Sequence, residues 1–122
     1  LDDRLEPAAV VLGVEVGELT AAYPLATIGN GVVNDVVGET AVVVFSSSRG
    51  PTGAAYVPQV GGTQLTFVWE DGRFVDEQTG STWSLSGEAL DGELRGSQLQ
   101  PLPVRTTLWF ALIAAFPDLQ LR

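Results

Sequence analysis

Residues 65–74 read Leu-Thr-Phe-Val-Trp-Glu-Asp-Gly-Arg-Phe, and this stretch does most to decide the fold. Apolar side chains occupy every second position of its first half, which is the period of a strand with one covered face. Asp71-Gly72 supplies the two positive-φ positions of a type I′ turn. A two-residue loop places Trp69 opposite Phe74 and Glu70 opposite Arg73. The first pair is aromatic and the second is of opposite charge, so both favour this register. The stretch therefore predicts a β-hairpin.

Short apolar runs bounded by glycine and proline extend the β pattern in both directions from the hairpin. Residues 41–45 are continuously apolar, which predicts a central strand covered on both faces. Residues 46–53 are rich in serine and glycine and predict a loop. Residues 56–60 predict an irregular edge strand, because Pro58 cannot donate to a ladder. Further strands are predicted at residues 8–16, 18–23, 32–37, 82–85 and 119–121, with one helical turn at 25–28.

The period changes near the C-terminus, where residues 108–116 read Leu-Trp-Phe-Ala-Leu-Ile-Ala-Ala-Phe. This segment predicts a helix that Thr106-Thr107 would cap and Pro117 would end. We therefore expect a single domain over residues 1–122, mainly β (α+β), built as a barrel-like or sandwich arrangement with one short C-terminal helix. The chain contains no methionine, so we expect a processed product or a piece of a longer chain.

Composition excludes several classes of function. The 122 residues carry 15 acidic and 6 basic side chains, a formal net charge of −9, which disfavours nucleic acid as a partner. The absence of cysteine and histidine removes thiolate metal sites, cysteine nucleophiles and the commonest general base. No apolar run approaches the ~18 residues that a transmembrane helix needs. We expect no metal, no cofactor and no enzymatic activity.

Three groups of side chains are candidates for catalytic or binding residues. Ser46-Ser47-Ser48 lacks a histidine or lysine to act as its base, so a small polar loop is the better interpretation. The aromatic rings at 67, 69 and 74 would suit a stacking platform, but their alternation favours the core. A catalytic pair or a calcium site remains an alternative for the carboxylates, although turns and strand ends account for several of them. These carboxylates are Asp35, Asp71, Asp76, Glu77 and Glu88.

The predicted C-terminal helix has no polar residue on any face. A surface helix normally shows an apolar stripe about 100° wide and a polar remainder. In a domain of this size, one side of such a helix lies on the core, and the other side meets another subunit, another domain or lipid, unless loops and the C-terminal tail cover it. The predicted interface residues are Leu108, Trp109, Phe110, Leu112, Ile113 and Phe116.

Several short segments occur in the order and spacing of one bacterial and archaeal family. They are Ala21-Ala22-Tyr23-Pro24, Asn34-Asp35, Leu65-Thr66-Phe67, Thr79-Gly80-Ser81-Thr82-Trp83-Ser84, Gly87-Glu88-Ala89, and Trp109 followed by Phe116-Pro117-Asp118. Over residues 11–121 the chain resembles the family called domain of unknown function 3179. The resemblance implies a location outside the cytoplasm.

The departures from the family pattern concern its reactive side chains. The family's Cys-x-x-Cys and a nearby histidine resemble a metal or redox site, but these positions hold Ser46, Arg49 and Asn30 here. The resemblance thus implies a vestigial ligand site formed by Asn30, Asn34, Asp35, Ser46 and Arg49. Charged positions of the family's terminal helix have likewise become apolar.

Two functions remain open at this point. The first is a non-catalytic structural or interaction subunit, docked through the apolar helix into a larger assembly of protein partners, with a lipid surface as another neighbour. The alternative is a small-ligand or cation-binding module beside the loop at 46–53, with Asn30, Asn34 and Asp35 as its ligands.

Overall fold

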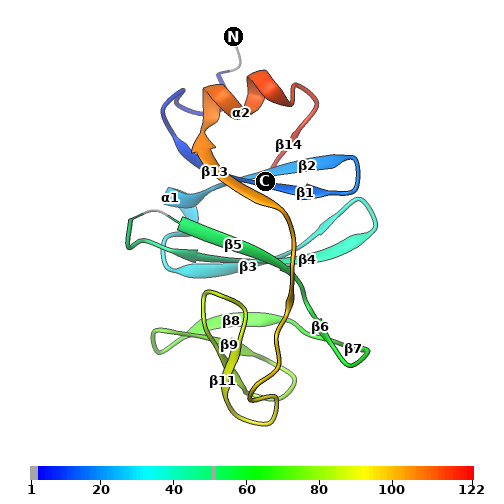
Figure 1. Cartoon of the computed structure of the whole chain (residues 1–122). Helices are drawn as coiled ribbons and strands as arrows, with labels where there is room; N and C mark the ends of the chain where they lie inside the picture. Colours follow the sequence, from blue (N-terminus) through cyan, green and yellow to red (C-terminus); the bar gives the residue numbers. More distant parts are fainter. Residues whose placement is uncertain (1–2, 51) are drawn as a thin grey trace.

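Sheet pairing divides the chain into stacked layers. The computed structural model describes residues 3–50 and 52–122. Figure 1 shows helix α2 (Trp109–Ala115) above three β-sheets that lie one below another. In chain order the other elements are β1 (Val10–Val16), β2 (Leu19–Pro24), α1 (Leu25–Ile28), β3 (Gly31–Val37), β4 (Thr40–Ser47), β5 (Thr52–Val57), β6 (Gln59–Val60), β7 (Thr63–Gln64), β8 (Phe67–Glu70), β9 (Arg73–Asp76), β10 (Thr82–Trp83), β11 (Ala89–Asp91), β12 (Gln100–Pro101), β13 (Val104–Leu108) and β14 (Gln120–Leu121).

Each layer is a small sheet made largely of antiparallel pairs. The first sheet has the order β13-β1-β2-β14, the middle sheet β12-β5-β4-β3 and the third sheet β11-β10-β9-β8. The pairing of β14 with β2 is parallel. The sheets of the described residues stack as a sandwich and do not close into a barrel. The mainly β class with one short C-terminal helix is confirmed.

Three apolar clusters fill the spaces between these four layers. Trp109 and Leu112 of α2 pack on Val11 and Ala22 of the first sheet. A second cluster lies between the first and middle sheets, and a third, richer in aromatic rings, lies between the middle and third sheets. β4 contributes to both, because its successive side chains point to opposite faces. Residues 42–45 are all buried, which confirms the prediction of a central, doubly covered strand.

The hairpin prediction is confirmed in its register. β8 and β9 pair Trp69 with Phe74 and Glu70 with Arg73. Asp71 and Gly72 adopt φ values of 51° and 75°, as the type I′ turn requires. The core assignment is correct for two of the three aromatic rings but wrong for Trp69, which is 38% exposed. Trp69 lies near the outer end of β8, where its ring rests on Phe74 at 4.9 Å and leaves one side in water.

Two sequence predictions fail because pairing with distant strands overrides local preference. Thr106 and Thr107 belong to β13, where they pair with Leu12 and Val11 of β1. The helix instead follows Leu108, and no side chain caps it. The predicted edge strand at residues 56–60 is not one strand. Residues 56–57 end β5, which lies inside the middle sheet, whereas residues 59–60, after Pro58, form β6, which among the described residues pairs only with β7 in a separate two-stranded sheet and is therefore an edge strand.

Two predicted elements are shorter than expected. Ser46 and Ser47 extend β4, and Thr52 and Gly53 begin β5, because these residues pair across the β4–β5 hairpin. The described turn is residues 48–50, and residue 51 of the predicted loop lies outside the described residues. The predicted strand at residues 82–85 is reduced to Thr82–Trp83, although Trp83 is buried as expected.

Candidate functional site

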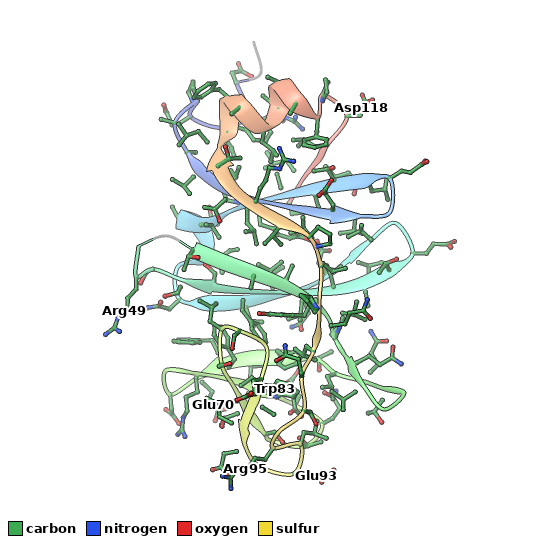
Figure 2. All side chains as sticks on the ribbon, viewed as in Figure 1. Arg49, Glu70, Trp83, Glu93, Arg95 and Asp118 are labelled. Atoms are coloured by element: carbon green, nitrogen blue, oxygen red, sulfur yellow. The ribbon has the colours of Figure 1, made fainter. Side chains whose placement is uncertain are left out.

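Three of the five residues in the predicted vestigial site lie together, where β3 begins and β4 ends. Gly31 and Ser46 are paired residues of this junction. Ser46 is fully buried and donates its hydroxyl hydrogen bond to the carbonyl of Gly29 at 2.7 Å. The side-chain oxygen of Asn30 accepts a bond from the Ser48 amide at 2.8 Å. The side chain of Arg49 points away from the sheets (Figure 2).

The polar side chains at this junction therefore hold the ends of β3 and β4 in place. The side chains of Ser46 and Asn30 are already hydrogen-bonded to backbone groups of the chain itself. A hydroxyl buried in this way is no nucleophile without a neighbouring base, and the sequence contains neither histidine nor lysine. Among the described residues, no three carboxylate, imidazole or thiol side chains gather as a metal site would require.

Asn34 and Asp35 have other partners than the residues of this junction. Their side chains point to opposite faces of β3, because neighbouring residues of a strand alternate between faces. Asn34 faces the third sheet. Its amide nitrogen donates to the carbonyl of Phe67 at 2.8 Å, and its side-chain oxygen accepts from the Phe67 amide at 2.9 Å. This one side chain thus replaces a pair of ladder bonds between β3 and β8, which are edge strands of two different sheets.

Asp35 faces the first sheet and ties three segments together. It accepts a hydrogen bond from the Tyr23 hydroxyl at 2.8 Å, and its carboxylate lies 3.4 Å from the Nε of Arg122. Burial, reinforced by the hydrogen bond and the negative charge of Asp35, raises the pKa of Tyr23 above its ordinary value, and Arg122 partly opposes the shift. Tyr23 and Asp35 belong to two segments of the family resemblance, and this hydrogen bond joins the two segments.

Asp76 is a buried carboxylate at the end of β9, as predicted. It accepts bonds from the Thr79 amide and hydroxyl and from the indole nitrogen of Trp83. Thr79 also shares a 2.7 Å hydroxyl contact with Ser81. The Thr-Gly-Ser-x-Trp segment is thus a turn organised around one carboxylate, with its oxygens occupied by the fold. The signal available in the sequence was local, since Thr79 and Trp83 follow Asp76 by only three and seven residues.

The carboxylates weighed as a catalytic pair come from separate parts of the fold. Asp35 is on β3, Asp76 is on β9, and Glu88 forms an isolated backbone bridge with Gln98 before β11. Asp35 and Asp76 each hold partners within the chain. The hydrogen bonds of Asp35 and Asp76 therefore give both carboxylates a structural role.

The surface is hollowed on both sides of Asn34. A hollow of about 340 Å³ lies beside the second half of β3, where Asp35, Val36 and Leu65 contribute to its walls. A wider hollow of about 560 Å³ lies beside the first half of β3 and is lined by Ile28, Val32, Trp69 and neighbouring residues. Sequence reasoning missed both, because they depend on how β3 and β8 meet in space.

The predicted interface residues divide between the inside and the outside of the molecule. Trp109 and Leu112 are buried against the first sheet, so these two cannot contact a partner. Ile113 and Phe116 are partly buried against the same cluster. Phe110 is 55% exposed and Leu108 is 37% exposed. The exposed part of the predicted surface is therefore smaller than the sequence suggested, and Phe110 is the most exposed of the six residues.

Basic side chains cover aromatic rings at both ends of α2. The guanidinium of Arg4 lies 5.2 Å from the ring centre of Trp109, and that of Arg105 lies 5.1 Å from Phe116. The segment before β1 contributes Leu5 and Ala9 to the same cluster. Neither helix of the described chain has the length and hydropathy needed to cross a bilayer.

These features define a layered, β-rich domain in which the side chains of Asn34, Asp35, Ser46 and Asp76 bond to other segments of the chain. The sequence matches the family described as "Protein of unknown function (DUF3179)" over residues 1–119. The chain belongs to this family. Searches of curated proteins and of solved structures each found no match.

Proposed function

We propose that this chain is a non-catalytic interaction domain that docks through the outer face of α2 into a larger assembly. The observation that carries the proposal is Phe110, a large apolar side chain more than half exposed on a helix that has no polar residue. An exposed aromatic side chain surrounded by other apolar groups is typical of a contact surface. Leu108, the residue before the helix, is also an exposed apolar side chain.

The occupant we propose is a protein with an apolar groove and a basic rim. The net charge of −9 opposes close approach of a second copy and favours a partner of opposite charge. Arg4 and Arg105, the basic residues beside α2, lie over aromatic rings, and Asp118 lies next to the end of the helix (Figure 2). Charges of both signs therefore lie near α2, and it is the net charge of the whole chain that favours a basic partner.

The non-catalytic part of the proposal rests on the side chains that the sequence lacks and on those that the fold occupies. The chain has no histidine, cysteine or lysine. Ser46 and Asp76 are buried and hydrogen-bonded within the fold. We also propose a location outside the cytoplasm, which the family resemblance supports and which fractionation of the producing cells would test.

A pair of matched variants tests the docking proposal. Phe110→Asp places a charge on the outer face of α2, and Leu90→Asp does the same on β11, where Leu90 is 52% exposed. The native protein is separated by size from gently lysed producing cells. We expect the wild type and Leu90→Asp to migrate in an assembly larger than the chain, and Phe110→Asp to migrate alone. Equal migration of the two variants contradicts the proposal.

A further inference from the structure

A second surface lies at the edge of β3, away from α2. The two-residue turn between β3 and β4 pairs Val37 with Thr40, and the pair next to such a turn exchanges both backbone hydrogen bonds. The alternation then directs the backbone groups of Val32, Asn34 and Val36 away from β4. The strand order leaves β3 at the rim of the middle sheet, so these groups point outward.

Two contacts confirm this alternation at the second half of the strand. A nitrogen of the Arg122 guanidinium donates to the carbonyl of Val36 at 3.0 Å, and the Val36 amide donates to the carboxylate of Asp35 at 2.8 Å. These contacts close the edge at Val36. Charged side chains that occupy an edge in this way prevent another strand from pairing there.

The first half of β3 has no such guard within the described residues. Val32 and Asn34, whose backbone groups are directed outward by this alternation, line the hollow of about 560 Å³ together with Ile28, Val68 and Trp69. The same reasoning applied to the β8–β9 turn directs the backbone of Phe67 and Trp69 outward, and the side chain of Asn34 already bonds both groups of Phe67. An unguarded edge therefore borders a hollow with apolar walls.

We propose that the Val32–Asn34 edge binds an extended peptide segment of a partner protein, which adds a strand to the middle sheet. Outward backbone groups at every second residue are complementary to an extended backbone. The hollow would receive one apolar side chain of the segment between Ile28 and Trp69. The segment carries basic residues, because the net charge of −9 favours them and opposes pairing with β3 of a second copy.

A phage-displayed library of random dodecapeptides, selected on the 122-residue chain, tests the proposal. We expect enriched peptides with alternating apolar residues and basic flanks, whose addition slows hydrogen exchange of the Val32 and Asn34 amides. Methylation of alternate peptide nitrogens should weaken binding about tenfold or more, because strand pairing loses its donors. Failure to enrich any peptide, or unchanged binding after methylation, would overturn the proposal.

Two proline variants separate this site from its guarded end and from α2. Val32→Pro removes one outward donor, and we expect it to weaken binding about tenfold. Val36→Pro, at the guarded end, should leave binding unchanged. Peptides that bind Val32→Pro normally but lose affinity for Phe110→Asp would occupy α2, which would overturn the β3 proposal and leave the docking proposal standing. A β3-dependent dimer of the chain alone, seen by sedimentation, would also overturn it.

Discussion

Asn34 joins two sheets that share no ladder at this point. Its carboxamide makes both a donor and an acceptor bond to the backbone of Phe67. Removal of such a side chain leaves a backbone amide and a carbonyl without their partners at the junction between the middle and third sheets. The bridge therefore contributes to stability as well as to the geometry of the hollows beside it.

We expect Asn34→Ala to lower the free energy of unfolding by about 1–3 kcal/mol, because two hydrogen bonds are lost. Asn30→Ala is the matched control, since Asn30 is exposed and accepts one bond, from Ser48. Its expected cost is about 1 kcal/mol or less. Urea denaturation followed by tryptophan fluorescence measures both values. Equal losses for the two variants would show that the bridge adds nothing specific.

Tyr23 makes stability depend on pH in the alkaline range. Its pKa is raised in the folded chain, first by burial and then by Asp35. A raised pKa means that the folded state keeps the proton while the unfolded chain loses it above about pH 10. The stabilisation is therefore complete below that pH and declines as the pH rises further.

Urea midpoints measured from pH 8 to beyond about pH 10 check this dependence. The wild type should lose stability steeply above pH 10. Tyr23→Phe should be less stable at pH 8, because it lacks the bond to Asp35, but should show a shallower decline. Burial also raises the pKa of Tyr56, so Tyr56→Phe serves as an independent comparison. Parallel curves for the wild type and Tyr23→Phe would refute the assignment.

The local role of a residue could be predicted from the sequence better than its contacts with distant residues. The buried Trp83 and the turn residue Asp71 were predicted, because alternation and turn chemistry are local. The partners of Asp35 were not predicted, since Tyr23 lies on another strand and Arg122 lies at the C-terminal end of the chain. Asn34 and Asp35 were assigned to one site, but their side chains point to opposite faces.

Helix α2 has one face buried against the first sheet and one face exposed to solvent. Trp109 is fully buried against the first sheet, whereas the next residue, Phe110, is more than half exposed. We expect Trp109→Ala to cost about 3–5 kcal/mol, as a truncated core aromatic side chain does. Phe110→Ala should change stability by no more than about 0.5 kcal/mol. Thermal or urea unfolding of the two variants measures this contrast, and a large loss for Phe110→Ala would show that the chain itself uses this face.

The elements that the sequence predicted well are those with local causes. The β8–β9 hairpin needs only its alternation and its Asp-Gly turn, and its register was correct. The helix was placed to within one residue at each end. Its cap was not, because Thr106 and Thr107 pair with β1, which is far away in the sequence. The gain from this pairing exceeds the local preference of threonine for a helix start.

At the scale of the whole molecule, the layered arrangement explains how a short chain buries several apolar strands on both faces. The middle sheet is covered by the first sheet on one side and by the third sheet on the other. The alternating and short apolar runs predicted a mainly β domain. The order of the sheets and the two hollows beside β3 arise from non-local pairing, which periodicity does not encode.

The most direct measurement places the photo-crosslinking residue p-benzoylphenylalanine at position 110 and, separately, at position 90, in the cells that produce the protein. Both positions carry exposed apolar residues on different elements. If α2 docks onto a protein partner, position 110 gives an adduct of one discrete mass with a different, basic protein, and position 90 gives none. The absence of an adduct at 110, the same adducts from both positions, or an adduct with a second copy would contradict it.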